Sequence, residues 1–108
     1  DPRGIFRVEI TSKLHPVTRE MESFEADDEL YVCLTGDRPV ELLADARSKK
    51  TGLDHPMAFT LSYGEGRVFH TPLGHDARAI HIPGTAEMIR RGVAWAAGRP
   101  VVRSKQNP

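Results

Sequence analysis

The chain has 108 residues and a mass of 12.0 kDa, the size of one small domain. Apolar residues make up 39% and charged residues 28%, a balance that argues against a disordered chain. Lys plus Arg and Asp plus Glu are both 15, so the basic excess typical of a nucleic-acid binder is missing. No apolar run approaches the roughly 18 residues of a membrane span, and Cys33, the single cysteine, excludes internal disulfides and a cysteine-rich zinc site. We see no signal-peptide pattern, and the sequence favours the cytoplasm without fixing the compartment.

The first half of the chain predicts short strands separated by polar segments. Residues 6–10 alternate between apolar and charged side chains, which is the period of a half-buried strand. His15-Pro16 ends this pattern, and the polar residues 17–29 predict a short helix or a loop. Two further short strands are predicted over 30–34 and 40–43, with a turn at 36–39 between them.

Six carboxylates are concentrated between residues 20 and 29. A run of this kind is usually a solvated face of the protein. The alternative is a cluster that binds a cation or sugar hydroxyls. The six residues are Glu20, Glu22, Glu25, Asp27, Asp28 and Glu29.

The second half predicts a hairpin followed by a helix. Residues 57–63 and 67–71 have strand patterns and are joined by Gly64-Glu65-Gly66, which fits a hairpin loop. A helix is predicted over 85–97, with Thr85 as its N-cap and Gly98 just after its end. A polar tail over 98–108 follows.

The segment Leu73-Gly74-His75-Asp76 lies between the hairpin and the helix. In open α/β sheets, ligands bind in the crevice beyond the carboxyl ends of the strands. An imidazole at His75 could act there as a general base, a hydrogen-bond partner or a metal ligand. The alternative is a structural histidine that bonds a nearby carbonyl. Cys33 lies between two apolar residues and is expected to be a small buried side chain.

The ordered landmarks of the chain together resemble the C-terminal half of the ThuA-like (trehalose utilisation) family. The match extends over roughly residues 6–98, and one family position that is usually tryptophan is Phe59 here. The resemblance implies an α/β fold, namely the C-terminal half of a flavodoxin-like, class I glutamine amidotransferase-like layered fold. The landmarks are His15-Pro16-Val17-Thr18, Asp28-Glu29-Leu30-Tyr31, Pro56-Met57-Ala58-Phe59, residues 63–69, Leu73-Gly74-His75-Asp76 and residues 91–96.

The same resemblance implies that residues 1–108 form a single partial ThuA-like domain. Half of a layered sheet leaves an unpaired strand edge and an uncovered apolar face, and such edges pair with other chains. We therefore expect a homo-oligomer that completes the layers.

The resemblance further implies a role in the metabolism of trehalose or related keto-disaccharides, with a small-molecule carbohydrate as the partner and neither nucleic acid nor membrane. Carried over by position, His75 and Glu29 are the expected catalytic pair, and His15, Tyr31 and Asp76 are expected to bind substrate. An imidazole beside a carboxylate can move a proton next to a sugar carbonyl. A half-domain could be inactive alone, so enzymatic activity is left open. The alternative is a non-catalytic module that binds carbohydrate or another protein.

No cofactor is assigned from the sequence, and no residue is assigned to a metal. No two histidines have the i, i+4 spacing of a zinc-binding helix. A zinc ion would need ligands from distant segments, and His15, Glu29 and His75 are of the right chemical type.

Overall fold

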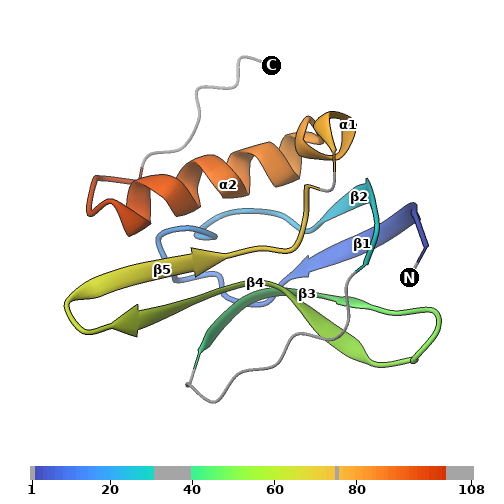
Figure 1. The fold of residues 1–108 in the computed structure, drawn as a ribbon, viewed down its shortest axis with the longest axis horizontal. Helices are drawn as coiled ribbons and strands as arrows, with labels where there is room; N and C mark the ends of the chain where they lie inside the picture. The colour runs from blue at the N-terminus through green and yellow to red at the C-terminus, as the bar shows by residue number, and fades with distance from the viewer. Residues whose placement is uncertain (1, 31–39, 75, 102–108) are drawn as a thin grey trace.

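The computed structural model describes residues 2–30, 40–74 and 76–101. These described residues form a five-stranded sheet with two helices (Figure 1). The strands are β1 (Gly4–Ile10), β2 (Phe24–Asp28), β3 (Glu41–Arg47), β4 (Asp54–Tyr63) and β5 (Gly66–His70), and the helices are α1 (Ala77–Ile80) and α2 (Pro83–Ala96).

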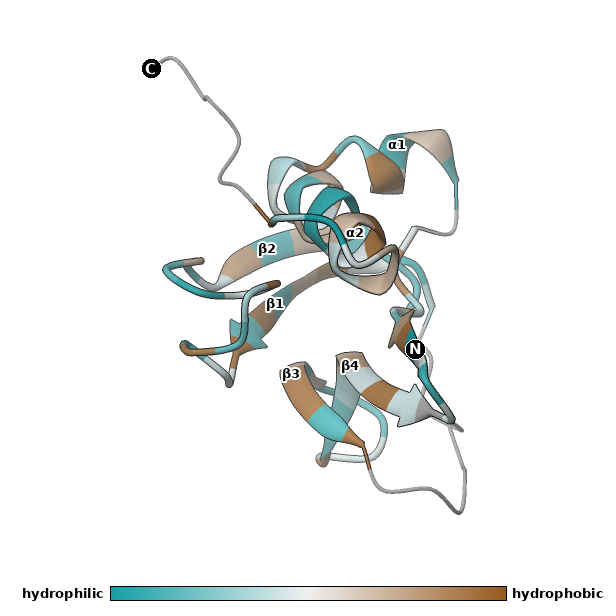
Figure 2. Ribbon diagram, turned by 90° about the vertical axis from the view of Figure 1, so that its left-hand side faces the viewer, coloured by the Kyte–Doolittle hydropathy of each residue, from teal (hydrophilic) through white to brown (hydrophobic). Residues whose placement is uncertain are grey.

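The sheet is curled and antiparallel, with the strand order β2-β1-β3-β4-β5. Helix α2 crosses one side of it, and the short helix α1 lies beyond the end of β2 (Figures 1 and 2). The α/β class and the C-terminal helix agree with the sequence. The flavodoxin-like layering is not confirmed, because that fold is built on a parallel sheet, whereas every strand pair among the described residues is antiparallel.

The first predicted strand is confirmed as β1. Val8 and Ile10 are buried, whereas Arg7 and Glu9 between and beside them are exposed. The prediction for residues 17–29 is wrong in its last part, because 24–28 form the edge strand β2. The sequence does not show an alternation of apolar and polar residues in this strand, because one of its two buried positions is the carboxylate Asp28.

The strand predicted over 40–43 is confirmed as β3, which extends to residue 47. The strand predicted over 30–34 and the turn at 36–39 fall, apart from Leu30, outside the described residues. The hairpin is confirmed as β4 and β5, which pair from Phe59 opposite His70 to Tyr63 opposite Gly66.

Helix α2 approaches the sheet closely because two of its residues lack a side chain. A Cβ on Gly84 would lie 2.3 Å from the Phe24 ring of β2, and one on Gly92 would lie 2.4 Å from the Phe69 ring of β5. Only glycine at these two positions allows so short a separation between helix and strands. The N-terminal part of α2 therefore packs on the edge strand β2, and its C-terminal part packs on the other edge strand, β5.

The predicted helix is confirmed, but its predicted N-cap is wrong. The N-cap is Ile82, which makes no side-chain capping hydrogen bond, and Thr85 lies buried inside the helix. Pro83 explains the earlier start, because its fixed φ and missing N–H suit the first turn of a helix. Gly98 follows the end of the helix with a φ of +72°, as predicted.

One side of the sheet retains exposed apolar side chains. Ile5 is 61% exposed and alternates along β1 with Phe6, which packs against the core. Val68 is 39% exposed and precedes Phe69, whose ring contacts α2. These side chains therefore face away from α2, as expected for a sheet that is covered on one side.

Candidate functional site

His15, a predicted substrate-binding residue, is buried beneath the C-terminal part of α2. Its Nδ1 accepts the Val17 N–H at 3.1 Å, and its Nε2 lies 3.3 Å from the Thr60 hydroxyl of β4. The ring also packs 5.0 Å from the Trp95 ring, between centroids. Because Nδ1 accepts a hydrogen bond, the neutral ring carries its proton on Nε2.

Burial lowers the pKa of His15, and the nearby Arg67 acts in the same direction. Glu41 opposes this by favouring the charged form. The ring is therefore held neutral more firmly than a histidine in water, which suits a structural role.

Arg91 fixes the segment that carries His15 to α2. Its side chain is 6% exposed, and its Nη1 donates to the carbonyl oxygens of Val17 at 3.3 Å and Arg19 at 2.9 Å. Its Nε donates to Glu87, one helical turn earlier, at 2.7 Å. We call His15, Thr60, Arg91 and Trp95 the buried histidine cluster.

A second polar group lies at the other end of α2, around Asp28. This residue is 1% exposed, and its two carboxylate oxygens accept main-chain N–H groups from different segments. Oδ1 accepts from Glu29 at 2.7 Å, and Oδ2 accepts from Gly74 at 2.6 Å. One carboxylate thus joins the end of β2 to a segment that is 46 positions away in the chain.

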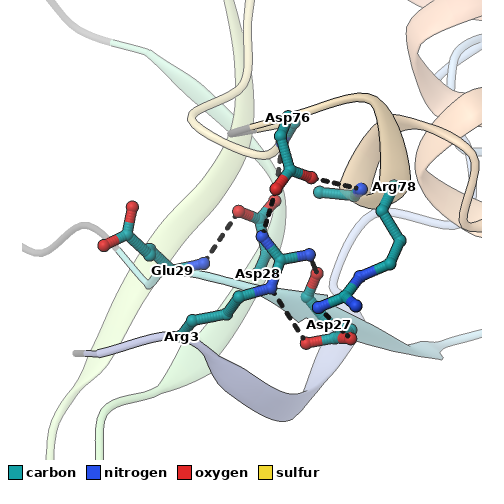
Figure 3. Close-up of polar contacts among 8 residues, drawn as sticks. Arg3, Asp27, Asp28, Glu29, Asp76 and Arg78 are labelled. Atoms are coloured by element: carbon teal, nitrogen blue, oxygen red, sulfur yellow. Dashed lines mark hydrogen bonds and ion pairs between the residues drawn. The ribbon is translucent and has the colours of Figure 1, made fainter.

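Arg3 adds a second connection between the same segments. Its Nη1 donates to Asp76 Oδ2 at 2.5 Å, its Nη2 donates to the Asp27 carbonyl oxygen at 3.2 Å, and its Nε lies 3.4 Å from Asp27 Oδ1. Arg78 reaches Asp27 from α1, at 3.5 Å. We call Arg3, Asp27, Asp28, Gly74 and Asp76 the Asp28 corner (Figure 3).

The carboxylates of the Asp28 corner favour the charged form of Arg3. The hydrogen bond to Asp76 raises the pKa of Arg3, and the charges of Asp76, Asp27 and Asp28 act in the same direction against the opposing effect of desolvation. Asp76 has a further role, because its Oδ1 accepts the Ala79 N–H at 2.9 Å and so caps α1. The Asp76 side chain is nevertheless 47% exposed, so water and solutes reach it.

The structure brings together two of the five predicted site residues. Asp76 is part of the Asp28 corner and Glu29 borders it through its N–H, while the Glu29 side chain points away from the contacts around Arg3 (Figure 3). His15 lies at the far end of α2, next to Trp95. Trp95 is twelve positions after Pro83 in α2, which corresponds to about 18 Å along the helix. Tyr31 and His75 lie outside the described residues.

A shallow groove of about 320 Å³ lies beside Arg3, and its rim carries further cations. It is lined by Pro2, Arg3, Gly4, Ile5, Phe6, Lys49 and Lys50. Sequence reasoning did not identify Arg3 or Asp28 as site residues. An isolated arginine near the N-terminus gives no signal of its own, and Asp28 was one of six carboxylates in an acidic run.

The described residues contain no group of three or more His, Cys, Asp or Glu side chains that could hold a metal ion. His15 and Glu29, two of the three zinc ligands considered from the sequence, lie at opposite ends of α2. The third, His75, is outside the described residues.

Comparison with known families gives a match over most of the chain. The ThuA family model, described as trehalose utilisation, matches residues 2–96. No curated protein matches the chain. Among the described residues, neither helix has the length and apolar character needed to cross a membrane.

Proposed function

This chain belongs to the ThuA family, and from that premise we propose that it binds trehalose or a related disaccharide, keto forms included, at the Asp28 corner. His75 is the proposed acid or base, and Glu29 is its carboxylate partner. Tyr31 and Asp76 are the proposed contacts to sugar hydroxyls.

The observation that carries this proposal is the double hydrogen bond of Asp28. Four of the five site residues predicted from the sequence belong to two motifs, 28–31 and 73–76. The hydrogen bonds from Glu29 N and Gly74 N to one carboxylate hold these two motifs side by side. A pair of motifs so joined can present Glu29 and the segment that contains His75 to the same bound molecule.

The surroundings of the Asp28 corner suit a sugar. Arg3, Lys49 and Lys50 around the adjacent groove are hydrogen-bond donors, and Asp76 is a half-exposed acceptor. Sugar hydroxyls both donate and accept, so a rim of mixed character can pair with them.

The chemistry follows from the two proposed catalytic groups. An imidazole can take a proton from a sugar hydroxyl or give one to a leaving oxygen, and a neighbouring carboxylate stabilises the resulting imidazolium. His15 is left out of the site, because its ring is buried and both of its nitrogens have partners within the chain.

The test is to incubate the chain with trehalose, 3-keto-trehalose and related glycosides while sugar binding is followed by titration calorimetry. We expect binding that is lost in His75→Ala and weakened in Glu29→Gln. His81→Ala is the matched control, since His81 is an exposed histidine at the end of α1. Turnover would establish catalysis, and binding without turnover would identify a non-catalytic carbohydrate module. Failure to bind any of these sugars would contradict the proposal.

A further inference from the structure

Gly74 and Asp76 are each attached to β2, Gly74 directly and Asp76 through Arg3. On one side, Gly74 donates its N–H to Asp28 at 2.6 Å. On the other, the Asp76 carboxylate accepts from Arg3, which also bonds the Asp27 carbonyl oxygen in β2. The residues that flank His75 therefore each have a fixed attachment to the same strand.

The two attachments differ in their exposure to solvent. Asp28 is 1% exposed, whereas the side chains of Arg3 and Asp76 are 25% and 47% exposed. Hydrogen bonds from N–H groups to a carboxylate are short and strong, and they are stronger still when water is excluded. The contact from Gly74 to Asp28 is thus the firmer of the two.

The backbone at Gly74 is itself unusual. Its φ is +99°, a conformation that L side chains rarely adopt, so the chain can turn there because the residue is glycine. A Cβ at this position would lie 3.0 Å from Ile80 of α1. The positive φ and the closeness of Ile80 therefore both favour glycine at this turn, and Asp28 accepts its N–H.

We propose that Asp28 is a positioning residue of the carbohydrate site, which holds Gly74 beside Glu29 through its two main-chain hydrogen bonds. Asp28 makes no contact with the sugar in this scheme. It acts through Glu29, whose N–H it binds on one oxygen, and through Gly74 on the other. This inference rests on the proposed function for its consequence, but the contact itself can be tested without any sugar.

The experiment compares the wild-type chain with the Asp28→Asn variant, and Glu25→Gln is the matched control. Each variant removes one carboxylate from β2, but Glu25 is exposed and lies opposite Arg7 in the strand register. An asparagine keeps the size of Asp28 and places an N–H₂ group where one of the two main-chain N–H groups needs an acceptor.

The first experiment uses NMR to measure two properties of the Gly74 amide, its rate of hydrogen exchange and its ¹H chemical shift. We expect slow exchange and a downfield shift in the wild type and in Glu25→Gln. In Asp28→Asn we expect exchange at least tenfold faster at Gly74 and an unchanged Trp95 indole signal. An unprotected Gly74 amide in the wild type overturns the proposal even if Asp28→Asn does not fold.

The second measurement is a titration with trehalose and 3-keto-trehalose. We expect affinity to fall at least fivefold in Asp28→Asn and to stay within a factor of two in Glu25→Gln. Wild-type affinity in Asp28→Asn, despite a released Gly74 amide, overturns the positioning role. If the wild type binds neither sugar, the proposed function fails, and the exchange data still decide whether Asp28 holds Gly74.

Discussion

The buried histidine cluster and the Asp28 corner stand at opposite ends of α2 and use similar groups in different surroundings. Each contains an arginine that donates to main-chain carbonyl oxygens. Arg91 is 6% exposed and contacts Val17 and Arg19, whereas Arg3 is 25% exposed and contacts Asp27. The same chemistry is therefore sealed from water at one end of the helix and open to it at the other.

This difference separates a structural site from a candidate binding site. In the buried histidine cluster, both nitrogens of His15 have partners within the chain, and a ligand would have to displace packed core to reach them. At the Asp28 corner, Asp76 is half exposed and a groove lies beside Arg3. A polar solute can compete for contacts there without unfolding the protein.

The largest effect should come from removing the buried arginine. In Arg91→Ala, the Val17 and Arg19 carbonyl oxygens lose their donor and the segment around His15 loses its attachment to α2. We expect the free energy of unfolding to fall by about 3 kcal/mol, as is typical when buried hydrogen-bonded groups lose a charged partner. Urea denaturation measures this.

Arg90→Ala is the matched control for that experiment. Arg90 also bonds Glu87, at 2.8 Å, but its side chain is 40% exposed. Its loss should cost no more than about 0.5 kcal/mol, because exposed ion pairs contribute little. Equal losses for the two arginines would show that the end of α2 near His15 is not sealed from water.

An intermediate effect is expected from pH at His15. Burial lowers the pKa of this histidine in the folded chain, so the unfolded chain binds a proton more readily. The free energy of unfolding should therefore fall as the pH is lowered from about 7 through the ordinary histidine range near 6.5. Urea denaturation at several pH values, for wild type and His15→Gln, measures the slope.

His15→Gln should be less stable at neutral pH and should lose part of the pH dependence. The carboxylate with a lowered pKa, Glu9, affects stability only at more acidic pH, because carboxylates titrate near pH 4. An identical slope in the two proteins would mean that the His15 ring gains its proton without cost and is not enclosed as described.

Much of the fold could be predicted from the sequence, because several of its strands and its long helix are determined by residues close together in the chain. The alternation at 6–10, the two-glycine hairpin and the helix ending before Gly98 each depend on neighbours in the chain. β2 was missed since its pattern includes a buried charge. Burial of Asp28 is stabilised by the N–H of Gly74, a partner that no short-range pattern reveals.

The candidate site was predicted less completely for the same reason. The family resemblance selected Glu29 and Asp76, which the structure places together. It also selected His15, which the structure places beside Trp95. The sequence alone does not show whether a histidine side chain is buried in the core or open to a ligand. Arg3 was not selected at all, because its partners Asp27 and Asp76 are far from it in the chain.

The smallest effect should come from Arg3→Gln at the Asp28 corner. Its ion pairs with Asp27 and Asp76 are partly open to solvent, so dissolved salt weakens them. At 1 M ionic strength the Debye screening length falls to about 3 Å. We expect a loss of stability in dilute buffer that is smaller than that of Arg91→Ala and that disappears at high salt. The loss in Arg91→Ala should persist at both salt concentrations, since its partners are buried. If the Arg3→Gln loss were as large as that of Arg91→Ala and insensitive to salt, the Asp28 corner would be closed to water, and a polar ligand could not compete for its contacts.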